Sequence, residues 1–391
     1  MTVSRRTVLA GLAGIGAAAR GGAALAQPAM PKSPVVITVV DVAGNLALTQ
    51  KAIENYRKAK PNVVSRFAFT KAPAPELPAK LKAQQAAGRV DIDLVLTGTD
   101  ALAAGLDQKL WVDLKPYAGQ LPKPEDIYQP PALKMQALAQ GQGACVTYYP
   151  SGPLLEYMPE RVKTVPQTAQ ELLDWAKQNK GKFMYARPAN SGPGRTWLMG
   201  LPYLLNDKDP KDPEKGWDKT WSFLKEIGET VDYYPGGTTQ TMKELGEGTR
   251  DMIVSTTGWD INPRVLGIVP KEAEVVALKG FHWVADAQYM CVPKGISDEK
   301  LAVMLDLMSF MLQPAQQAYT YDEGYFYPGP AVKGVTLVMA PADSQAAIKE
   351  YGRAKYDDLI ANNPIEIPLD PDKIVVAFRR WDEQVGSGKS K

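Results

Sequence analysis

The sequence predicts an α/β fold in which parallel strands alternate with helices. Three apolar segments rich in β-branched residues, at 35–40, 63–69 and 92–96, have the composition of buried strands. Helical segments at 46–60 and 78–87 separate them. This regular alternation of strand and helix is typical of a mostly parallel sheet that is flanked by helices.

The carboxyl ends of these strands are the expected place for a ligand, because crevices of open α/β sheets form at that edge. Asn45 is a suitable N-cap for the first helix, which Pro61 ends. Polar residues follow the first strand and the third strand, and four of them become candidate ligand contacts: Asp41, Asn45, Thr97 and Thr99.

A second lobe is expected beyond the strand at 143–149, because about 365 residues exceed what one hydrophobic core usually supports. The segments that follow predict helices at 169–179 and 217–227, a helix that starts near Arg195, a short helix that ends at Gly246, and strands at 183–185 and 251–255. The segment 287–292 is the predicted return strand.

Three further helices are predicted, at 298–321, 341–361 and 371–385. We therefore expect lobe one to comprise 34–145 and 292–340, and lobe two to comprise 146–291. The C-terminal helices of 341–391 should pack on the lobes.

The first 26 residues have the pattern of a cleavable bacterial export signal. The paired Arg5 and Arg6 precede an apolar stretch, and the small residues that end at Ala26 predict cleavage after that residue. The arginine pair indicates the twin-arginine route. Arg20 interrupts the apolar stretch, which is shorter than the roughly 20 apolar residues of a membrane-spanning helix.

Removal of this signal changes the charge of the chain. The signal contains three arginines and no acidic residue, so the formal net charge falls from +2 to −1. A near-neutral protein lacks the basic surface that binds nucleic acid or anionic membranes.

The residues for common catalytic sites are scarce. His282 is the only histidine, which excludes a mechanism with two imidazoles and a histidine-rich metal site. The chain contains neither the phosphate-binding Gly-x-x-x-x-Gly-Lys-Ser/Thr motif nor the Gly-x-Ser-x-Gly nucleophile motif. A glycosidase needs only two carboxylates, so the amino-acid composition does not exclude this class of enzyme, although no pair of acids is singled out. We expect no cofactor and no metal.

The two cysteines lie in the two predicted crossover strands, Cys145 in the outgoing one and Cys291 in the return one. Adjacent strands would bring them together, and export permits oxidation. The sequence therefore allows two interpretations of the cysteines. They form either a disulfide or a pair of buried thiols whose Cβ vectors do not match.

Aromatic and polar residues gather at predicted strand ends and turns, where a small-molecule pocket would form. The candidates are Tyr148, Trp259, Asp260, Asp286 and Tyr325. Two helix starts could bind an anion through free backbone N–H groups, with Ser191, Arg195 and Thr238 as their candidates. The aspartates suit an amine instead, so the sign of the ligand's charge stays open.

Several motifs resemble the bacterial extracellular solute-binding proteins that serve ABC importers. The resemblance is strongest at 91–96, at 170–176, and in the segment that joins the return strand ending in Pro293 to the helix ending at Gln313-Pro314-Ala315-Gln316. That last pattern is similar to the group that handles polyamines, thiamine and ferric iron. The resemblance implies a two-lobed, type II periplasmic binding protein fold with two crossover strands at the hinge.

The resemblance also bears on the ligand. Polyamine receptors place a Trp and an Asp before the return strand, and Trp283 and Asp286 match in type, with a longer spacing to Pro293. Ferric receptors use a tyrosine pair, for which Tyr148-Tyr149 or Tyr233-Tyr234 would stand.

The resemblance implies a monomeric periplasmic receptor that closes on a small solute, a polyamine-like amine or another small organic molecule, and presents it to a membrane permease. The alternatives are a ferric-ion receptor and an exported enzyme on the same two-lobed fold.

Overall fold

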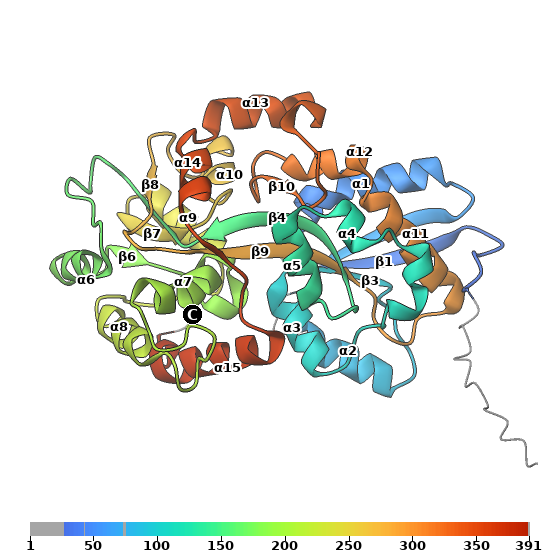
Figure 1. Ribbon diagram of the computed structural model, residues 1–391, viewed down its shortest axis with the longest axis horizontal. Helices are drawn as coiled ribbons and strands as arrows, with labels where there is room; N and C mark the ends of the chain where they lie inside the picture. Colours follow the sequence, from blue (N-terminus) through green and yellow to red (C-terminus); the bar gives the residue numbers. More distant parts are fainter. Residues whose placement is uncertain (1–26, 43, 73–75, 390–391) are drawn as a thin grey trace, which may run out of the picture.

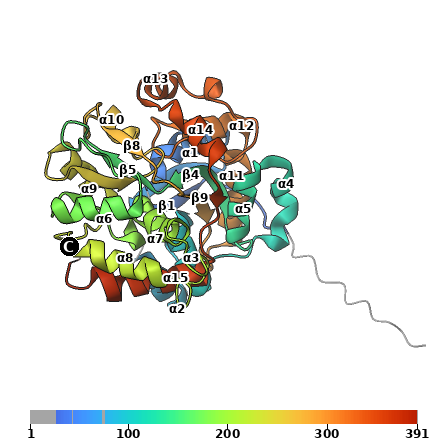
Figure 2. The same ribbon diagram turned by 60° about the vertical axis from the view of Figure 1, so that its left-hand side comes forward.

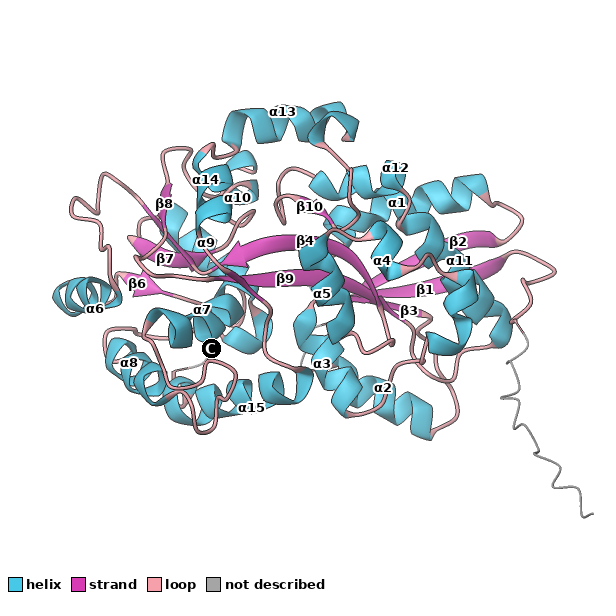
Figure 3. Cartoon of the chain, viewed as in Figure 1, coloured by secondary structure: helices cyan, strands magenta, loops and turns pink. Residues whose placement is uncertain are grey.

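Two long strands, β4 (Ala144–Gly152) and β9 (Trp283–Cys291), run antiparallel through the centre of the molecule (Figure 1). The computed structural model describes residues 27–42, 44–72 and 76–389. The export signal predicted at 1–26 lies outside this part of the chain. The strands form a band across the middle of the structure, with helices above and below it (Figure 3).

The larger sheet has the strand order β10-β4-β9-β3-β1-β2, and β11 pairs with β9. Strands β2 and β3 are parallel to β1, whereas β9 is antiparallel to both β3 and β4. The remaining strands of this sheet are β1 (Val35–Asp41), β2 (Val64–Lys71), β3 (Leu94–Thr97), β10 (Gly329–Pro330) and β11 (Ile365–Glu366).

The smaller sheet has the order β6-β7-β5-β8, and all of its strands come from the segment between β4 and β9. They are β5 (Leu154–Tyr157), β6 (Phe183–Met184), β7 (Met252–Ser255) and β8 (Glu274–Val276). Each sheet is the centre of one lobe, and the two-lobed α/β prediction is confirmed. The exact lobe limits stay predictions.

Helices cover both sheets. Those up to the first crossover are α1 (Leu46–Ala59), α2 (Leu77–Ala86), α3 (Thr99–Asp107), α4 (Pro124–Ile127) and α5 (Pro130–Leu138). Those between the crossovers are α6 (Ala169–Gln178), α7 (Gly192–Leu204), α8 (Asp218–Gly228), α9 (Thr238–Gly246) and α10 (Asn262–Val265). The last are α11 (Asp298–Met311), α12 (Pro314–Gln317), α13 (Ala342–Tyr351), α14 (Lys355–Asn362) and α15 (Pro371–Trp381). Among the described residues, no helix has the length and apolar character that a bilayer span requires.

The predicted elements differ from the structure mainly at their ends. The helix predicted over 298–321 ends at Met311, because Pro314 begins a separate turn of helix. The helix predicted over 341–361 is interrupted at 352–354, which divides it into α13 and α14. Helices α3 and α5 and strand β5 were not predicted, although α5 begins with Pro130-Pro131, a common helix start.

The disulfide that the sequence left open does not form, and both cysteines are buried free thiols. The register of β4 against β9 places Cys145 opposite Tyr289, two residues away from Cys291. Diagonal neighbours of this kind are too far apart for a disulfide. Gly143 lies next to Cys291 instead, since a Cβ at Gly143 would stand 3.0 Å from the Cys291 sulfur.

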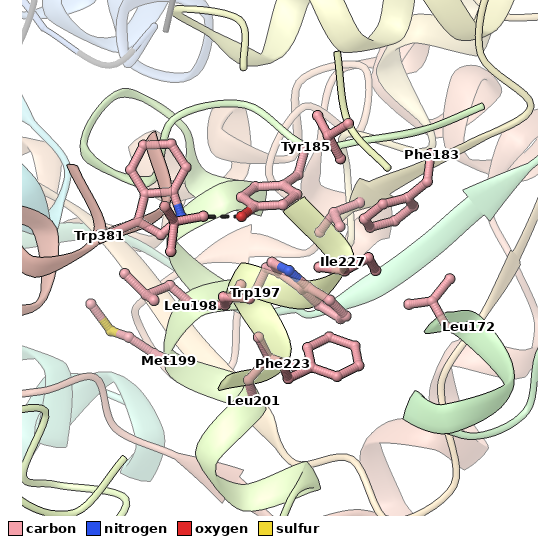
Figure 4. Packing of buried hydrophobic residues seen from close by; sticks show 14 of the residues in the cluster. Leu172, Phe183, Tyr185, Trp197, Leu198, Met199, Leu201, Phe223, Ile227 and Trp381 are labelled. Carbon is pink, nitrogen blue, oxygen red and sulfur yellow. Dashed lines mark hydrogen bonds between the residues drawn. The ribbon is translucent and has the colours of Figure 1, made fainter. Parts of the chain in front are cut away.

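The core of the second lobe extends into the C-terminal helix (Figure 4). The Trp381 indole N–H donates to the Tyr185 hydroxyl at 3.1 Å, and the Trp381 ring lies 4.9 Å from that of Tyr234. Helix α15 also lies beside α3 of the first lobe, as both views show (Figures 1 and 2). The last helix therefore contacts both lobes.

Chemical titration tests the state of the cysteines. Protein that is unfolded in denaturant without reductant should present two reactive thiols, and the same two after reduction. In the native protein both should react slowly, because burial raises the pKa of each thiol. Absence of free thiols before reduction would show that the bridge forms after all.

Removal of Trp381 tests the anchoring of the C-terminal helix. Trp381→Ala should lower the free energy of unfolding by about 3–5 kcal/mol, because it leaves a large cavity in a dry core. Val375→Ala, at an exposed position of the same helix, should change it by less than about 0.5 kcal/mol. Urea titrations of the three proteins measure both effects, and equal values for the two variants would contradict the anchor.

Candidate functional site

A cavity of about 460 Å³ lies between the lobes, where the carboxyl ends of β1 and β2 face the second lobe. The first lobe contributes Asp41, Val42, Gly44, Lys71, Ala72 and Asp100. The second lobe contributes Asn190, Gly192, Arg195, Gly236, Gly237, Thr238, Thr239 and Trp259. Tyr149 of β4, Gln288 of β9 and the pair Tyr325-Phe326 complete the lining.

Five predicted contact residues line this cavity: Asp41, Arg195, Thr238, Trp259 and Tyr325. They come from sequence positions almost 300 residues apart, and the double crossover brings them together. That each contacts a ligand stays a prediction.

Four other predicted residues lie one layer behind the lining and hold it in place. Thr99 donates to Asp286 at 3.1 Å, and Asp286 binds the lining residue Arg195. Ser191 is the N-cap of α7, where its hydroxyl accepts from the Gly194 N–H and lies 2.7 Å from the Thr238 hydroxyl.

The fourth residue of this layer is Asn45, whose amide lies 3.5 Å from the side-chain oxygen of Gln288. Asn45 stands at the N-cap position of α1, but its side chain does not cap the helix, because its oxygen accepts from the Thr49 hydroxyl.

Arg195 connects the two lobes through two carboxylates. One terminal nitrogen lies 2.5 Å from Asp286 and the other lies 3.1 Å from Asp100, and all three side chains are buried. Burial by itself would lower the pKa of Arg195, but Asp286 and Asp100 outweigh burial and hold that pKa above its ordinary value. The guanidinium is thus charged and already neutralised by protein groups.

The charges near the inner end of the cavity have an acidic excess. Asp41, Asp100 and Asp286 are three carboxylates, and Arg195 is the buried cation among them, while Lys71 is exposed. Two helix starts also reach the cavity, at Gly192 and at Thr238. Asp286 lies close to the first of them, since a Cβ at Gly192 would stand 3.7 Å from its carboxylate. The arrangement favours a cation more than an anion.

An aromatic row forms one wall of the cavity. The rings of Tyr149 and Phe326 stack at 4.7 Å, those of Phe326 and Tyr325 lie 4.5 Å apart, and those of Tyr325 and Trp259 lie 5.2 Å apart. Tyr149 also donates to Asp286 at 3.1 Å. Aromatic faces beside carboxylates can hold an organic cation.

Two predicted residues do not line the cavity. Tyr148 lies in the apolar core of the first lobe, because neighbouring residues of a strand face opposite sides, and Tyr149 lines the cavity in its place. Thr97 is completely buried, and its hydroxyl donates to the Gly98 carbonyl at 3.1 Å.

Asp260, another predicted ligand contact, also lies outside the cavity lining. It is completely buried, and its carboxylate binds Arg353 at 2.5 Å and Arg264 at 3.5 Å. Glu156 of β5 is a buried acid in the same region, and neither of its carboxylate oxygens has a hydrogen-bond partner in the described part of the chain. A buried charged group needs partners, so Asp260 serves this cluster rather than the cavity.

Thirteen of the eighteen lining residues were not among the predicted contacts, and Lys71, Gln288 and Tyr149 are three of them. Lys71 ends β2, so the same reasoning from strand ends that selected Asp41 would have found it. Gln288 lies two residues after Asp286 on β9 and therefore faces the same side of the sheet. Tyr149 differs from the predicted Tyr148 by one position, and the sequence contains no signal that decides between them.

Comparisons with known proteins agree with this geometry. The sequence profile of the family described as "Bacterial extracellular solute-binding protein" matches residues 51–350. A comparison with curated protein sequences returns no significant match.

Three solved structures illustrate the structural similarity. A putative spermidine/putrescine ABC transporter from Listeria monocytogenes superposes with a TM-score of 0.61 at 14% identity, covering 88% of this chain and 99% of the other. A periplasmic thiamin binding protein gives 0.63 at 15% identity, covering 92% and 100%. Iron-bound HitA from Pseudomonas aeruginosa gives 0.57 at 16% identity, covering 88% and 99%. These likenesses show the type II binding-protein fold.

Substitution of Glu156 tests the buried acidic cluster. Burial, and after it the charge of Asp260, raise the pKa of Glu156 from 4.5 to about 8. Between these values the unfolded chain has released a proton that the folded protein retains, so the free energy of unfolding falls as the pH rises. Glu156→Gln removes this loss and should stabilise the protein by roughly 3 to 5 kcal/mol near pH 8, and by little near pH 4.

Denaturant unfolding at a series of pH values measures this effect. Glu229→Gln, a change at an exposed position of the same lobe, serves as the control and should leave the pH profile as in the wild type. A Glu156→Gln profile parallel to that of the wild type from pH 4 to pH 8 would contradict the raised pKa.

Proposed function

Because the chain belongs to the family of bacterial extracellular solute-binding proteins, we propose that it is a periplasmic receptor that captures a small solute between its two lobes and delivers it to the permease of an ABC importer. The cavity between the lobes carries the proposal, since its lining combines both lobes and both crossover strands. A ligand in such a place contacts both lobes at once and thereby stabilises the closed form.

We propose an organic amine as the solute. Asp41, Asp100 and a row of four aromatic rings line the cavity, and Asp286 lies directly behind them. Of the two cations in the described lining, Lys71 is exposed, and the buried Arg195 is already bound by Asp100 and Asp286. A protonated amine balances the excess of negative charge and can lie against the aromatic faces. The named ligands of two structural neighbours, spermidine/putrescine and thiamin, support this chemical class.

The ferric alternative has weaker support from the positions of the tyrosines. Tyr148 lies in the core of the first lobe and Tyr234 in the core of the second, so neither predicted pair presents two phenols to the cavity.

The enzyme alternative has weaker support, because the described lining residues include neither a cysteine nor a histidine. His282 stacks on Tyr203 and pairs with Glu366 at 2.9 Å, away from the lining, and both thiols are buried in the first lobe. We therefore propose a binding protein without catalytic activity.

The location and the assembly are part of the proposal. We propose export by the twin-arginine route with cleavage after Ala26, followed by action in the periplasm as a monomer. The extracellular character of the family supports export.

A thermal-shift screen followed by calorimetry tests the amine proposal. Spermidine, putrescine and thiamine are the amine probes, and organic acids and ferric salts are the competing classes. We expect an amine to raise the melting temperature by preferential binding to the folded protein. Turnover of a substrate, with no stabilisation by any probe, would contradict the receptor function.

Asp41→Asn then tests the site with the amine that binds. The amide retains an oxygen for the hydrogen bond from the Asn45 N–H, now 2.8 Å long, but removes the charge. We expect the Kd to rise about tenfold or more, which corresponds to about 1.4 kcal/mol or more. Asp91→Asn, at an exposed acid of the same lobe, should leave the Kd unchanged, and an equal effect of both variants would refute a specific role for Asp41.

A further inference from the structure

A single arginine in the C-terminal segment connects that segment to the loop that carries Trp259. Arg353 lies in the break between α13 and α14 and is almost completely buried. Its Nε donates to Asp260 at 2.5 Å, and its two terminal nitrogens donate to Glu274 at 3.0 Å and to the Ala273 carbonyl at 2.6 Å. These bonds use both edges of the guanidinium, a geometry that lysine does not reproduce fully.

Asp260 transfers this restraint to its own loop. Its second oxygen accepts from the Gly258 N–H at 3.2 Å, and its carbonyl accepts from the side chain of Arg264 at 2.6 Å. Arg264 in turn donates to the carbonyl of Tyr351 at the end of α13, also at 2.6 Å. The loop at 258–260 is thus held from behind by the C-terminal segment at two points.

The front of the same loop packs directly on the segment that carries Tyr325. Gly258 has a φ of +102°, and a Cβ there would stand 2.4 Å from the Tyr325 carbonyl, so this position requires glycine. The next residue, Trp259, meets the Tyr325 ring at 5.2 Å, and both rings line the cavity. The position of the indole therefore depends on a loop that is fixed on both of its sides.

We propose that Arg353 is a positioning residue of the binding site, which holds Trp259 in the aromatic wall through Asp260. Without Arg353, the buried carboxylate of Asp260 loses its shortest bond and faces the nearby acid Glu156 with less compensation. A rearrangement of 258–260 relieves that repulsion and displaces the indole. The proposal rests on the proposed function only in taking the aromatic wall as the place where the solute binds.

The experiment reads the position of Trp259 without any ligand, so its outcome does not depend on the identity of the solute. Protein labelled with 5-fluorotryptophan gives one ¹⁹F resonance for each of its eight tryptophans. Trp259→Phe identifies the resonance of residue 259. In Arg353→Met this resonance should shift by more than its linewidth, while those of the core residues Trp197 and Trp217 stay in place.

Two further variants sharpen the result. Arg353→Lys retains the charge and should bring the resonance of Trp259 back toward its wild-type position. Arg250→Met is the matched control, because Arg250 is similarly buried, lies in the second lobe like Trp259, pairs with Glu244 at 2.8 Å and with Asp232 at 3.0 Å, and does not line the cavity. It should leave the resonance of Trp259 in place.

A double variant covers the case in which Arg353→Met does not fold. Arg353→Met with Asp260→Asn removes one charge of each sign, so that no unpaired carboxylate is left at position 260, and it should still displace the resonance of Trp259, since the connection to the loop is lost. A folded variant of either kind with an unchanged Trp259 resonance would overturn the proposal. Equal shifts of all eight resonances would also overturn it, because they would indicate a general loss of structure.

Discussion

The antiparallel pairing of β4 with β9 is the constraint on which the binding site depends. Both strands are completely buried, and they continue from the larger sheet toward the second lobe, so they are the two crossovers of the chain. Their register sets Tyr149 opposite Asp286. A shift of β4 by one residue would turn Tyr149 to the other face of the sheet, away from Asp286, and would disrupt the centre of the site.

Asp286 is the residue at which the parts of the site meet. It accepts hydrogen bonds from Thr99 of the first lobe, from Tyr149 of the crossover and from Arg195 of the second lobe. The positive charge of Arg195 is paired with the negative charge of Asp286. Arg195 is therefore a structural connection between the lobes and adds little positive charge to the cavity. The proposal of an amine ligand then rests on Asp41 and on the aromatic rings, which line the cavity together with the exposed Lys71.

The C-terminal segment packs against both lobes outside the cavity. Helix α13 lies beside α10 of the second lobe, and its Ile348 packs with Tyr321 of the first-lobe segment. Helix α15 joins the core of the second lobe and lies against α3. Any relative motion of the lobes must therefore be accommodated in these contacts, and Arg353 lies in the same segment, where it reaches the loop behind Trp259.

The sequence by itself determined the fold class, the order of the main elements and the strand ends that surround the cavity, because apolar periodicity and helix end signals are local properties. It predicted Asp41, Arg195, Trp259 and Tyr325 as contacts of one crevice, and all four line the cavity. Only the tertiary structure decided which face of β4 lines the cavity, that the cysteines are offset by two residues, and that Asp260 belongs to a buried cluster with Arg353. Those features depend on strand register and on charged partners distant in the sequence, which no local pattern specifies.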